Sequence, residues 1–192
     1  DMRMDQTKGV TAADVINTYE EKDLIHALKT YGEEKFAKKI VKAIIEYRET
    51  KGPIKMTLEL AELIKNTVPK RDLKKDPATK TFQALRILVN KEIEELENAL
   101  PIVFSYLKPK ARLVVISFHS LEDRIVKNYT KHQMKTDFIP KNIPIKASEI
   151  KLAPFKVVQK MITPTLKEIE QNPRSRSAKL RVIEKVMEAI WN

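Results

Sequence analysis

The chain has no cysteine, only three glycines and 6% aromatic residues among its 192 residues. Without cysteine it forms no disulfide, thiolate zinc site or cysteine nucleophile, a composition that fits a reducing compartment. Gly9, Gly32 and Gly52 are isolated, so they cannot form a glycine-rich turn that cradles a phosphate or a nucleoside. No apolar run approaches the roughly 20 residues of a membrane-spanning helix, and we expect no membrane partner.

Positive charge is what the chain has in excess. It contains 37 Lys and Arg against 26 Asp and Glu, a formal net charge of +11. Such an excess favours a polyanionic partner, nucleic acid above all, although many basic proteins bind none. The 42% hydrophobic and 33% charged residues indicate a chain that folds. Because the chain opens at Asp1 rather than at a start methionine, we expect it to be a piece of a longer protein.

The first part of the chain has the periodicity of several short helices. Thr11 offers a hydroxyl cap before an apolar stripe, and Gly32 is placed to end the second helix as a C-cap glycine. Residues 33–48 predict an amphipathic helix with one apolar and one lysine-rich face. Residues 77–107 predict one long helix, which Pro101 interrupts or kinks.

The second part of the chain contains strands. Residues 112–118 form a continuous, β-branched run, which predicts a strand buried on both faces in a parallel sheet. A helix follows from about Ser120, then a long loop over 134–154, and residues 155–162 and 179–186 predict two further strands. These pieces lack most of the partners needed to bury the first strand, so we expect the missing strands upstream of this chain.

Five strings of residues stand out: DMRMD at 1–5, YGEE at 31–34, TFQALRI with VNKE at 81–92, SFHSLEDR at 117–124 and NPRSRSAKLR at 172–181. In this order and at about this spacing, they resemble the bacterial-type ribosomal RNA small subunit methyltransferase H family over essentially the whole chain. The second-last string and FQALRI followed by VN are long and unusual enough to make coincidence negligible. The chain departs from the family pattern at Pro109-Lys110-Ala111-Arg112, where the family usually has Pro-Gly-Gly-Arg.

The resemblance implies an α/β fold, the class I (Rossmann-like) S-adenosylmethionine methyltransferase fold, interrupted by a helical insertion. Residues 1–90 would be the substrate-recognition insertion and residues 91–192 the C-terminal part of the methyltransferase domain. The N-terminal half of the sheet, with the cofactor-binding residues, would lie upstream of Asp1. The antiparallel pair at the end of the chain would be the edge of the sheet.

The implied activity is methylation of the N4 amine of a cytidine in small-subunit rRNA near the decoding site, with S-adenosylmethionine as cofactor. The partner would be small-subunit rRNA or the assembled small subunit, and the resemblance also allows a homodimer. The implied location is the bacterial cytoplasm, or the mitochondrial matrix or another organelle if the source is eukaryotic. Two alternatives stay open, a non-catalytic RNA-binding fragment and a ribosome-assembly module that lacks the cofactor half.

Three residues are the candidates for catalysis: Asp5, Ser117 and His119. His119 follows the predicted buried strand at the edge where open α/β sheets bind ligands. The alternative is that His119, like Glu122, caps the next helix. Asp5 could accept a hydrogen bond from the cytosine amine. The alternative for its cluster is a salt-bridged hinge.

The remaining candidates are polar or basic residues that would contact the RNA substrate, and no metal site is expected. They are Asp1, Arg3, Lys38, Lys42, Gln83, Arg86, Asn90 and Ser120. Basic residues of the segments 35–42 and 70–75 would hold the RNA backbone, although each charge run could equally be a solvated face. Phe82, Leu85 and Ile87 are expected in the core rather than as a surface on which bases stack.

Overall fold

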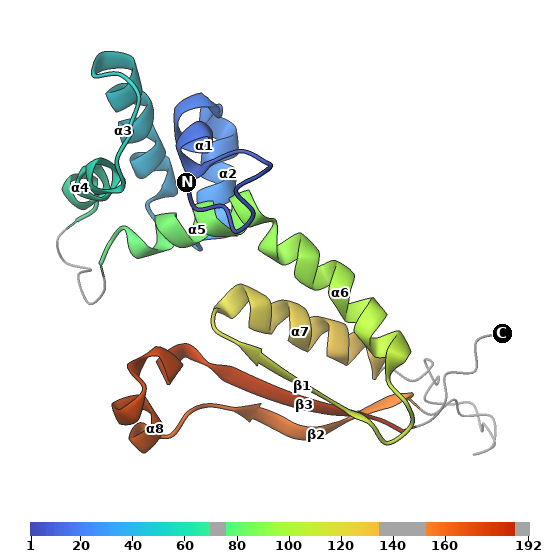
Figure 1. Ribbon diagram of the computed structural model, residues 1–192. Coiled ribbons are helices and arrows are strands. Elements are labelled where there is room, and N and C mark those ends of the chain that lie inside the picture. Colours follow the sequence, from blue (N-terminus) through green and yellow to red (C-terminus); the bar gives the residue numbers. More distant parts are fainter. Residues whose placement is uncertain (70–75, 135–152, 187–192) are drawn as a thin grey trace, which may run out of the picture. The chain divides into compact units, whose positions relative to one another are not determined.

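The computed structural model describes residues 1–69, 76–134 and 153–186. The chain divides into two compact units, Asp1–Glu92 and Ile93–Asn192. None of the described helices is both long and apolar enough to cross a bilayer. Figure 1 shows helices alone in the described part of the first unit and a sheet with helices in the second.

The first unit contains five helices among its described residues: α1 (Ala12–Thr18), α2 (Glu21–Thr30), α3 (Ala37–Thr50), α4 (Thr57–Thr67) and α5 (Thr79–Asn90). The predicted cap of α1 is confirmed. The Thr11 hydroxyl accepts a hydrogen bond from the Asp14 amide at 3.1 Å, and the Asp14 carboxylate accepts one from the Thr11 amide at 2.8 Å. This capping box satisfies two amides that the helix itself leaves unpaired.

One apolar core holds the helices of the first unit together. Its largest fully buried side chains include Leu24, Leu28, Ile40, Ile44, Ile64 and Leu85. Each such side chain contributes about 1.5–3 kcal/mol by leaving water. Leu85 and Ile87 are buried, as the sequence predicts, and Phe82 packs against the core at its margin.

Gly32 ends α2 and is also needed for close packing. Helix α2 ends at Thr30 with Tyr31 at the cap position, so Gly32 directly follows the cap, where the sequence predicts a helix-ending glycine. The left-handed residue lies one position later, at Glu33 with a φ of 49°. A Cβ atom at Gly32 would lie 2.6 Å from the carbonyl oxygen of Lys80 on α5 and 2.8 Å from that of Leu28. Only a residue without a side chain lets the two backbones approach this closely.

The predicted helix over 77–107 is two helices, α5 and α6 (Glu92–Tyr106). The break lies at Lys91, whose φ of 51° is left-handed and whose amide bonds the carbonyls of Ile87 and Leu88. The prediction placed the interruption at Pro101, but α6 continues through that residue. A lysine with left-handed backbone is uncommon, and the residues around Lys91 do not predict one.

The second unit is built on three strands, β1 (Arg112–Ser117), β2 (Phe155–Ile162) and β3 (Lys179–Lys185). They form an antiparallel sheet of order β1-β3-β2. The other described elements that follow α6 are α7 (Ser120–Gln133), α8 (Leu166–Gln171) and the short 3₁₀ helix η3 (Pro173–Ser177). The predicted strands and the antiparallel edge pair are confirmed. The sequence did not predict α8 and η3, because both lie in a polar stretch without helical periodicity.

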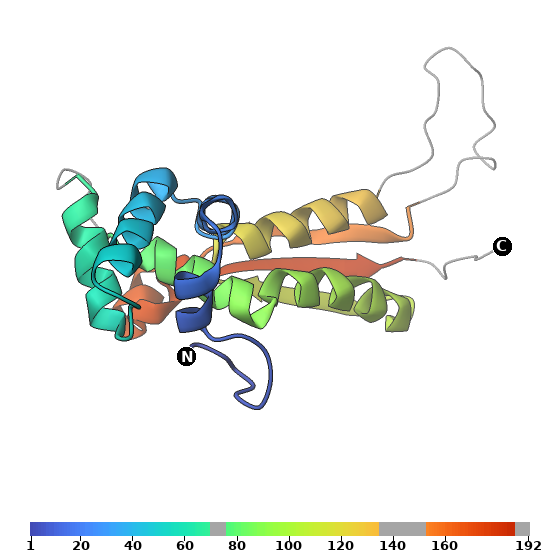
Figure 2. The same ribbon diagram turned by 90° about the horizontal axis from the view of Figure 1, so that it is seen from above.

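Helices α6 and α7 cover one face of this sheet (Figure 1), and seen from above they overlie the strands (Figure 2). The buried residues between them are Leu100, Phe104, Val126, Phe155 and Ile183. The Phe104 ring lies 4.6 Å from that of Phe155 and 4.9 Å from that of Tyr129, centroid to centroid. Aromatic contacts therefore make much of this small core.

The opposite face of β1 is open in the part of the chain that the structure describes. Val114, Ile116 and Phe118 are 53%, 55% and 55% exposed. Both covering helices lie on one side of the sheet, and the described partner of β1 is the antiparallel β3. Burial of β1 on both faces in a parallel sheet is therefore not met among the described residues; it depends on the further strands that the sequence analysis expects, and it stays a prediction.

Candidate functional site

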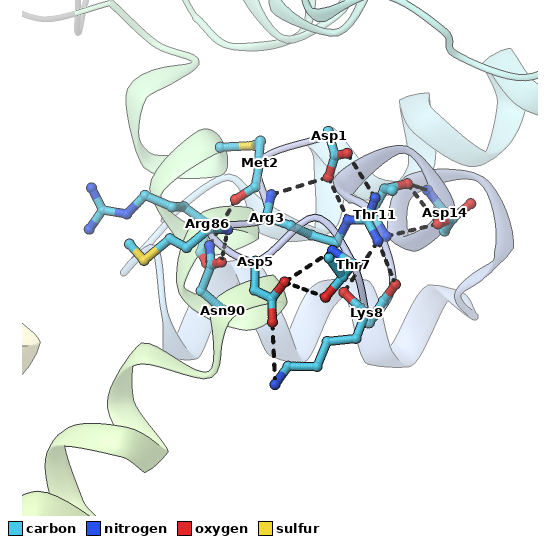
Figure 3. Close-up of polar contacts among 12 residues, drawn as sticks. Asp1, Met2, Arg3, Asp5, Thr7, Lys8, Thr11, Asp14, Arg86 and Asn90 are labelled. Carbon is cyan, nitrogen blue, oxygen red and sulfur yellow. Dashed lines mark hydrogen bonds and ion pairs between the residues drawn. The ribbon is translucent and has the colours of Figure 1, made fainter.

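Asn90, the last residue of α5, fastens the loop at residues 1–5 (Figure 3). Its side-chain oxygen accepts a hydrogen bond from the Met4 amide at 2.7 Å. Its side-chain nitrogen donates to the Met2 carbonyl at 2.8 Å and to the Arg86 carbonyl at 2.9 Å. One amide group thus holds the backbone on both sides of Arg3.

Arg3 and Asp1 form a bidentate ion pair inside the same loop. The two bonds join Nε to Oδ1 at 2.7 Å and Nη2 to Oδ2 at 2.9 Å. The remaining Arg3 nitrogen donates to the carbonyls of Lys8 and Gly9, both at 3.2 Å. These bonds occupy the guanidinium, which favours the salt-bridged alternative for Asp1 and Arg3 over contact with RNA.

Asp5 presents an exposed carboxylate beside this ion pair. Its Oδ1 accepts bonds from the Thr7 hydroxyl at 2.6 Å and the Thr7 amide at 3.0 Å, and Lys8 Nζ lies 3.3 Å from Oδ2. The hydrogen bond from the Thr7 hydroxyl, followed by that from the Thr7 amide, holds the pKa of Asp5 below its ordinary value. Asp5 is therefore an ionised hydrogen-bond acceptor at neutral pH and a weak base.

The polar residues of the FQALRI string have partners within the first unit. Gln83 donates to the Tyr31 carbonyl at 3.3 Å, and the Arg86 guanidinium binds both oxygens of Glu92 at 2.8 and 2.9 Å. Lys38 and Lys42 are exposed on α3 and form no ion pair among the described residues. The basic residues at 70–75 lie outside the described residues.

His119 caps helix α7. Its Nδ1 accepts a hydrogen bond from the Glu122 amide at 3.4 Å, and its Nε2 lies 3.2 Å from a Glu122 oxygen, although not aligned for a hydrogen bond. The other Glu122 oxygen accepts from the amides of Phe118 at 2.8 Å and His119 at 3.2 Å. The capping alternative for His119 and Glu122 is therefore what the structure shows, and a catalytic role for His119 stays a prediction.

The electrostatics of Glu122 follow from this cap. Partial burial raises its pKa, but the His119 side chain and the Phe118 amide outweigh the burial, so the pKa lies below the ordinary value. An ionised Glu122 also interacts favourably with the positive end of the helix dipole.

Ser117, His119 and Ser120 come together at the carboxyl end of β1. Ser117 is buried opposite Lys179 of β3, and Ser120 is exposed at the first position of α7. The other candidates belong to the first unit. The candidates thus form two groups, one in each unit.

Asp123 forms ion pairs that the sequence analysis did not predict. Its carboxylate binds Arg181 Nε at 2.7 Å and Lys179 Nζ at 3.4 Å, which ties α7 to β3. The Arg181 guanidinium holds the pKa of Asp123 below its ordinary value. Both partners lie in conspicuous strings, but their pairing spans 58 residues and gives no local signal.

The described residues do not fit S-adenosylmethionine. The turn from β1 to α7 contains no glycine, and His119 and Glu122 already bond the first amides of α7. Gly9 and Gly52 have open space around them, while the backbone of α5 crowds Gly32. No glycine-rich cradle for a nucleoside is present in this described part of the chain.

Comparison with known proteins gives three similar curated relatives, all named ribosomal RNA small subunit methyltransferase H. The protein of Methylobacillus flagellatus is 47% identical over 185 residues, 96% of this chain and 58% of the relative. That of Dechloromonas aromatica is 46% identical over 97% of this chain and 60% of the relative. That of Caldicellulosiruptor saccharolyticus is 50% identical over the same two shares.

The chain thus spans about 60% of the length of the curated relatives it matches. Its mixed α/β architecture agrees with the fold class that the sequence predicts. The MraW methylase family matches residues 1–186, and the chain belongs to this family.

Proposed function

We propose that this chain is part of a methyltransferase that uses S-adenosylmethionine to methylate the N4 amine of a cytidine near the decoding site of small-subunit rRNA. The observation that carries the proposal is the family match over residues 1–186. The relatives' shared name supports an rRNA substrate, as does the net charge of +11. Because the described residues do not form a cradle for the cofactor, the proposal assigns cofactor binding to another part of the protein.

The task proposed for this chain is to hold and orient the base. The cytosine amine is a poor nucleophile, because its lone pair is delocalised into the ring. A fixed acceptor that bonds one N–H localises that pair on the nitrogen. Asp5 supplies an exposed, ionised carboxylate on a loop that Asn90 anchors. Its lowered pKa suits an orienting acceptor better than a strong base.

The second unit would contribute a pocket wall of its own. Ser117, His119 and Ser120 lie at the carboxyl end of β1, the edge at which α/β sheets bind ligands. Since the His119 imidazole bonds Glu122, its proposed role includes fixing this segment as well as lining the pocket.

The basic surface would hold the RNA while the target base leaves its stack. Lys38 and Lys42 on α3 are the exposed cations proposed for backbone contacts. The partner is rRNA or the assembled small subunit, in the bacterial cytoplasm or an equivalent organelle. A homodimer is compatible with the proposal, and a measurement of the protein's molecular mass in solution tests for the dimer.

The test is single-turnover methylation of small-subunit rRNA by the full-length protein, with mass spectrometry to locate the methyl group. We expect N4-methylcytidine as product. Asp5→Ala and His119→Ala should each reduce the rate by about 10²–10⁴-fold with the fold intact. Asp5→Ala should leave the melting temperature unchanged, whereas His119→Ala should also lower it somewhat, because it removes the cap of α7.

The matched control is Glu62→Ala, which removes one exposed carboxylate of the first unit and should leave the rate unchanged. Methylation at another base or atom would contradict the proposed specificity. RNA binding without any methyl transfer would favour the non-catalytic alternative.

A further inference from the structure

The string at 172–181 contains four cations that the structure separates into two pairs. Lys179 and Arg181 lie on β3 and bind the carboxylate of Asp123. Arg174 and Arg176 lie on η3 and are exposed. Only the first pair has an acidic partner in the part of the chain that the structure describes.

The backbone of η3 is fixed mainly by Asn172 and Ser175. The Asn172 side chain accepts a hydrogen bond from the Arg174 amide at 3.2 Å. The Asn172 carbonyl accepts from the Ser175 amide at 2.9 Å and the Ser175 hydroxyl at 2.8 Å. Ser175 is 5% exposed, and its carbonyl accepts from the Ala178 amide at 2.7 Å. The turn therefore presents its arginines from a rigid base.

Both arginines of this turn are exposed, whereas Ser175 between them is buried. A 3₁₀ helix has three residues per turn, so Arg174 and Arg176 emerge on either side of the inward-facing Ser175. Arg176 donates one bond to the Pro173 carbonyl at 3.3 Å. Glu184, another carboxylate of this unit, is already bound by Arg112 at 2.9 Å and Lys156 at 2.7 Å.

The sheet register places this turn beside the proposed pocket wall. Strand β3 begins at Lys179, directly after η3, and Lys179 pairs with Ser117 at the carboxyl end of β1. Figure 1 shows α8 and the turn after it at the same end of the sheet as the start of α7. A polyanion bound at that end would therefore meet both arginines.

We propose that Arg174 and Arg176 form a phosphate-binding pair for the RNA backbone, an assignment that rests on the proposed function. Guanidinium groups bind phosphate oxygens bidentately. Because the two arginines emerge on different sides of η3, each contacts its own phosphate. A rigid turn reduces the conformational entropy that binding removes.

The test is fluorescence anisotropy of a labelled small-subunit rRNA fragment with the full chain, over a series of salt concentrations. Arg174→Ala with Arg176→Ala should lower the affinity at low salt by at least about tenfold. It should also reduce the slope of log affinity against log salt by about 1.4, since each contact to single-stranded RNA contributes about 0.7. Arg174→Lys with Arg176→Lys keeps the charge and should retain the slope while losing part of the affinity.

The matched control is Lys108→Ala with Lys110→Ala, which removes two exposed positive charges just before β1, at the opposite end of that strand. An equal loss in control and test variants, or an unchanged slope in the arginine variant, would overturn the phosphate pair. If the wild-type chain binds rRNA and the arginine variant binds equally well, the proposed function stands and only this assignment fails. If the wild-type chain itself does not bind, the phosphate pair fails, and the methylation assay with the full-length protein decides the proposed function separately.

Discussion

The two units of this chain are of similar length but bury their apolar side chains to different extents. The core cluster of the first unit contains fifteen buried residues and that of the second contains five, counted over the described residues. Conversely, most of the large exposed apolar side chains, including Val114, Ile116 and Phe118, belong to the second unit. An exposed apolar surface of this kind is typical of a face that further polypeptide or a ligand covers. Within the described residues, the first unit thus has a closed core, whereas one face of the second unit's sheet is uncovered.

The largest expected effect distinguishes the closed core from the open face. Leu28 is fully buried in the first unit, so Leu28→Ala should destabilise that unit by about 2–5 kcal/mol. Ile116 is 55% exposed on the open face, so Ile116→Ala should change the stability of the second unit by only about 0.5 kcal/mol. Hydrogen exchange with mass spectrometry reports each unit separately. Equal losses would break the comparison, because Ile116 would then be covered in solution.

A smaller effect is expected from the ion pair between α7 and β3. Asp123→Asn removes the charge that Arg181 and Lys179 share and should cost the second unit about 1–3 kcal/mol at pH 7. The folded pKa of Asp123 is lowered, so the stabilisation is present above the ordinary pKa of about 3.9 and is lost as pH falls through the folded value.

Amide exchange of the second unit, followed from pH 5 to pH 3, measures this loss. Glu184→Gln is the comparison variant. Glu184 is a second carboxylate of this unit with a lowered pKa, but its partners, Lys156 and Arg112, lie on the neighbouring strands rather than between α7 and β3. The asparagine variant should lose less stability on acidification than the wild type. An identical acid response in the two proteins would assign the stabilisation to other groups.

The smallest expected effect concerns the loop at residues 1–5. Asn90→Ala removes the bonds to the Met4 amide and the Met2 carbonyl and should cost about 1 kcal/mol, confined to that loop. The Met4 amide should exchange faster, while the core of the first unit stays protected. Asn90→Asp keeps an acceptor for Met4 but has no donor for Met2, so its effect should be intermediate. A loss of protection throughout the unit would show that the loop and the core unfold together.

Local signals in the sequence predicted what local chemistry determines. Thr11 caps α1 as expected, and the strand at 155–162 has the predicted bounds. The break at Lys91 was missed because its cause is a left-handed backbone, whereas Pro101 gave a stronger but misleading signal. The full burial predicted for β1 is absent among the described residues, because an apolar run indicates that a strand needs to be covered but not which segment covers it.

The candidate site divides in the same way. The capping of His119 and the pairing of Arg3 were both open alternatives, since their partners lie within three residues in the sequence. The bond of Asn90 to Met2 spans 88 residues and that of Asp123 to Arg181 spans 58. Such distant partners require the fold itself, because one sequence gives no register between separated segments.

Gly32 also makes the position of one helix depend on the size of a single side chain. The Lys80 carbonyl would lie 2.6 Å from a Cβ at position 32, so the turn after α2 meets α5 across a space that a hydrogen atom fills and a methyl group does not. An alanine at position 32 therefore requires the backbone at Lys80 to move. Because Asn90 ends the same helix, such a shift would be passed on to the loop at residues 1–5 that Asn90 anchors.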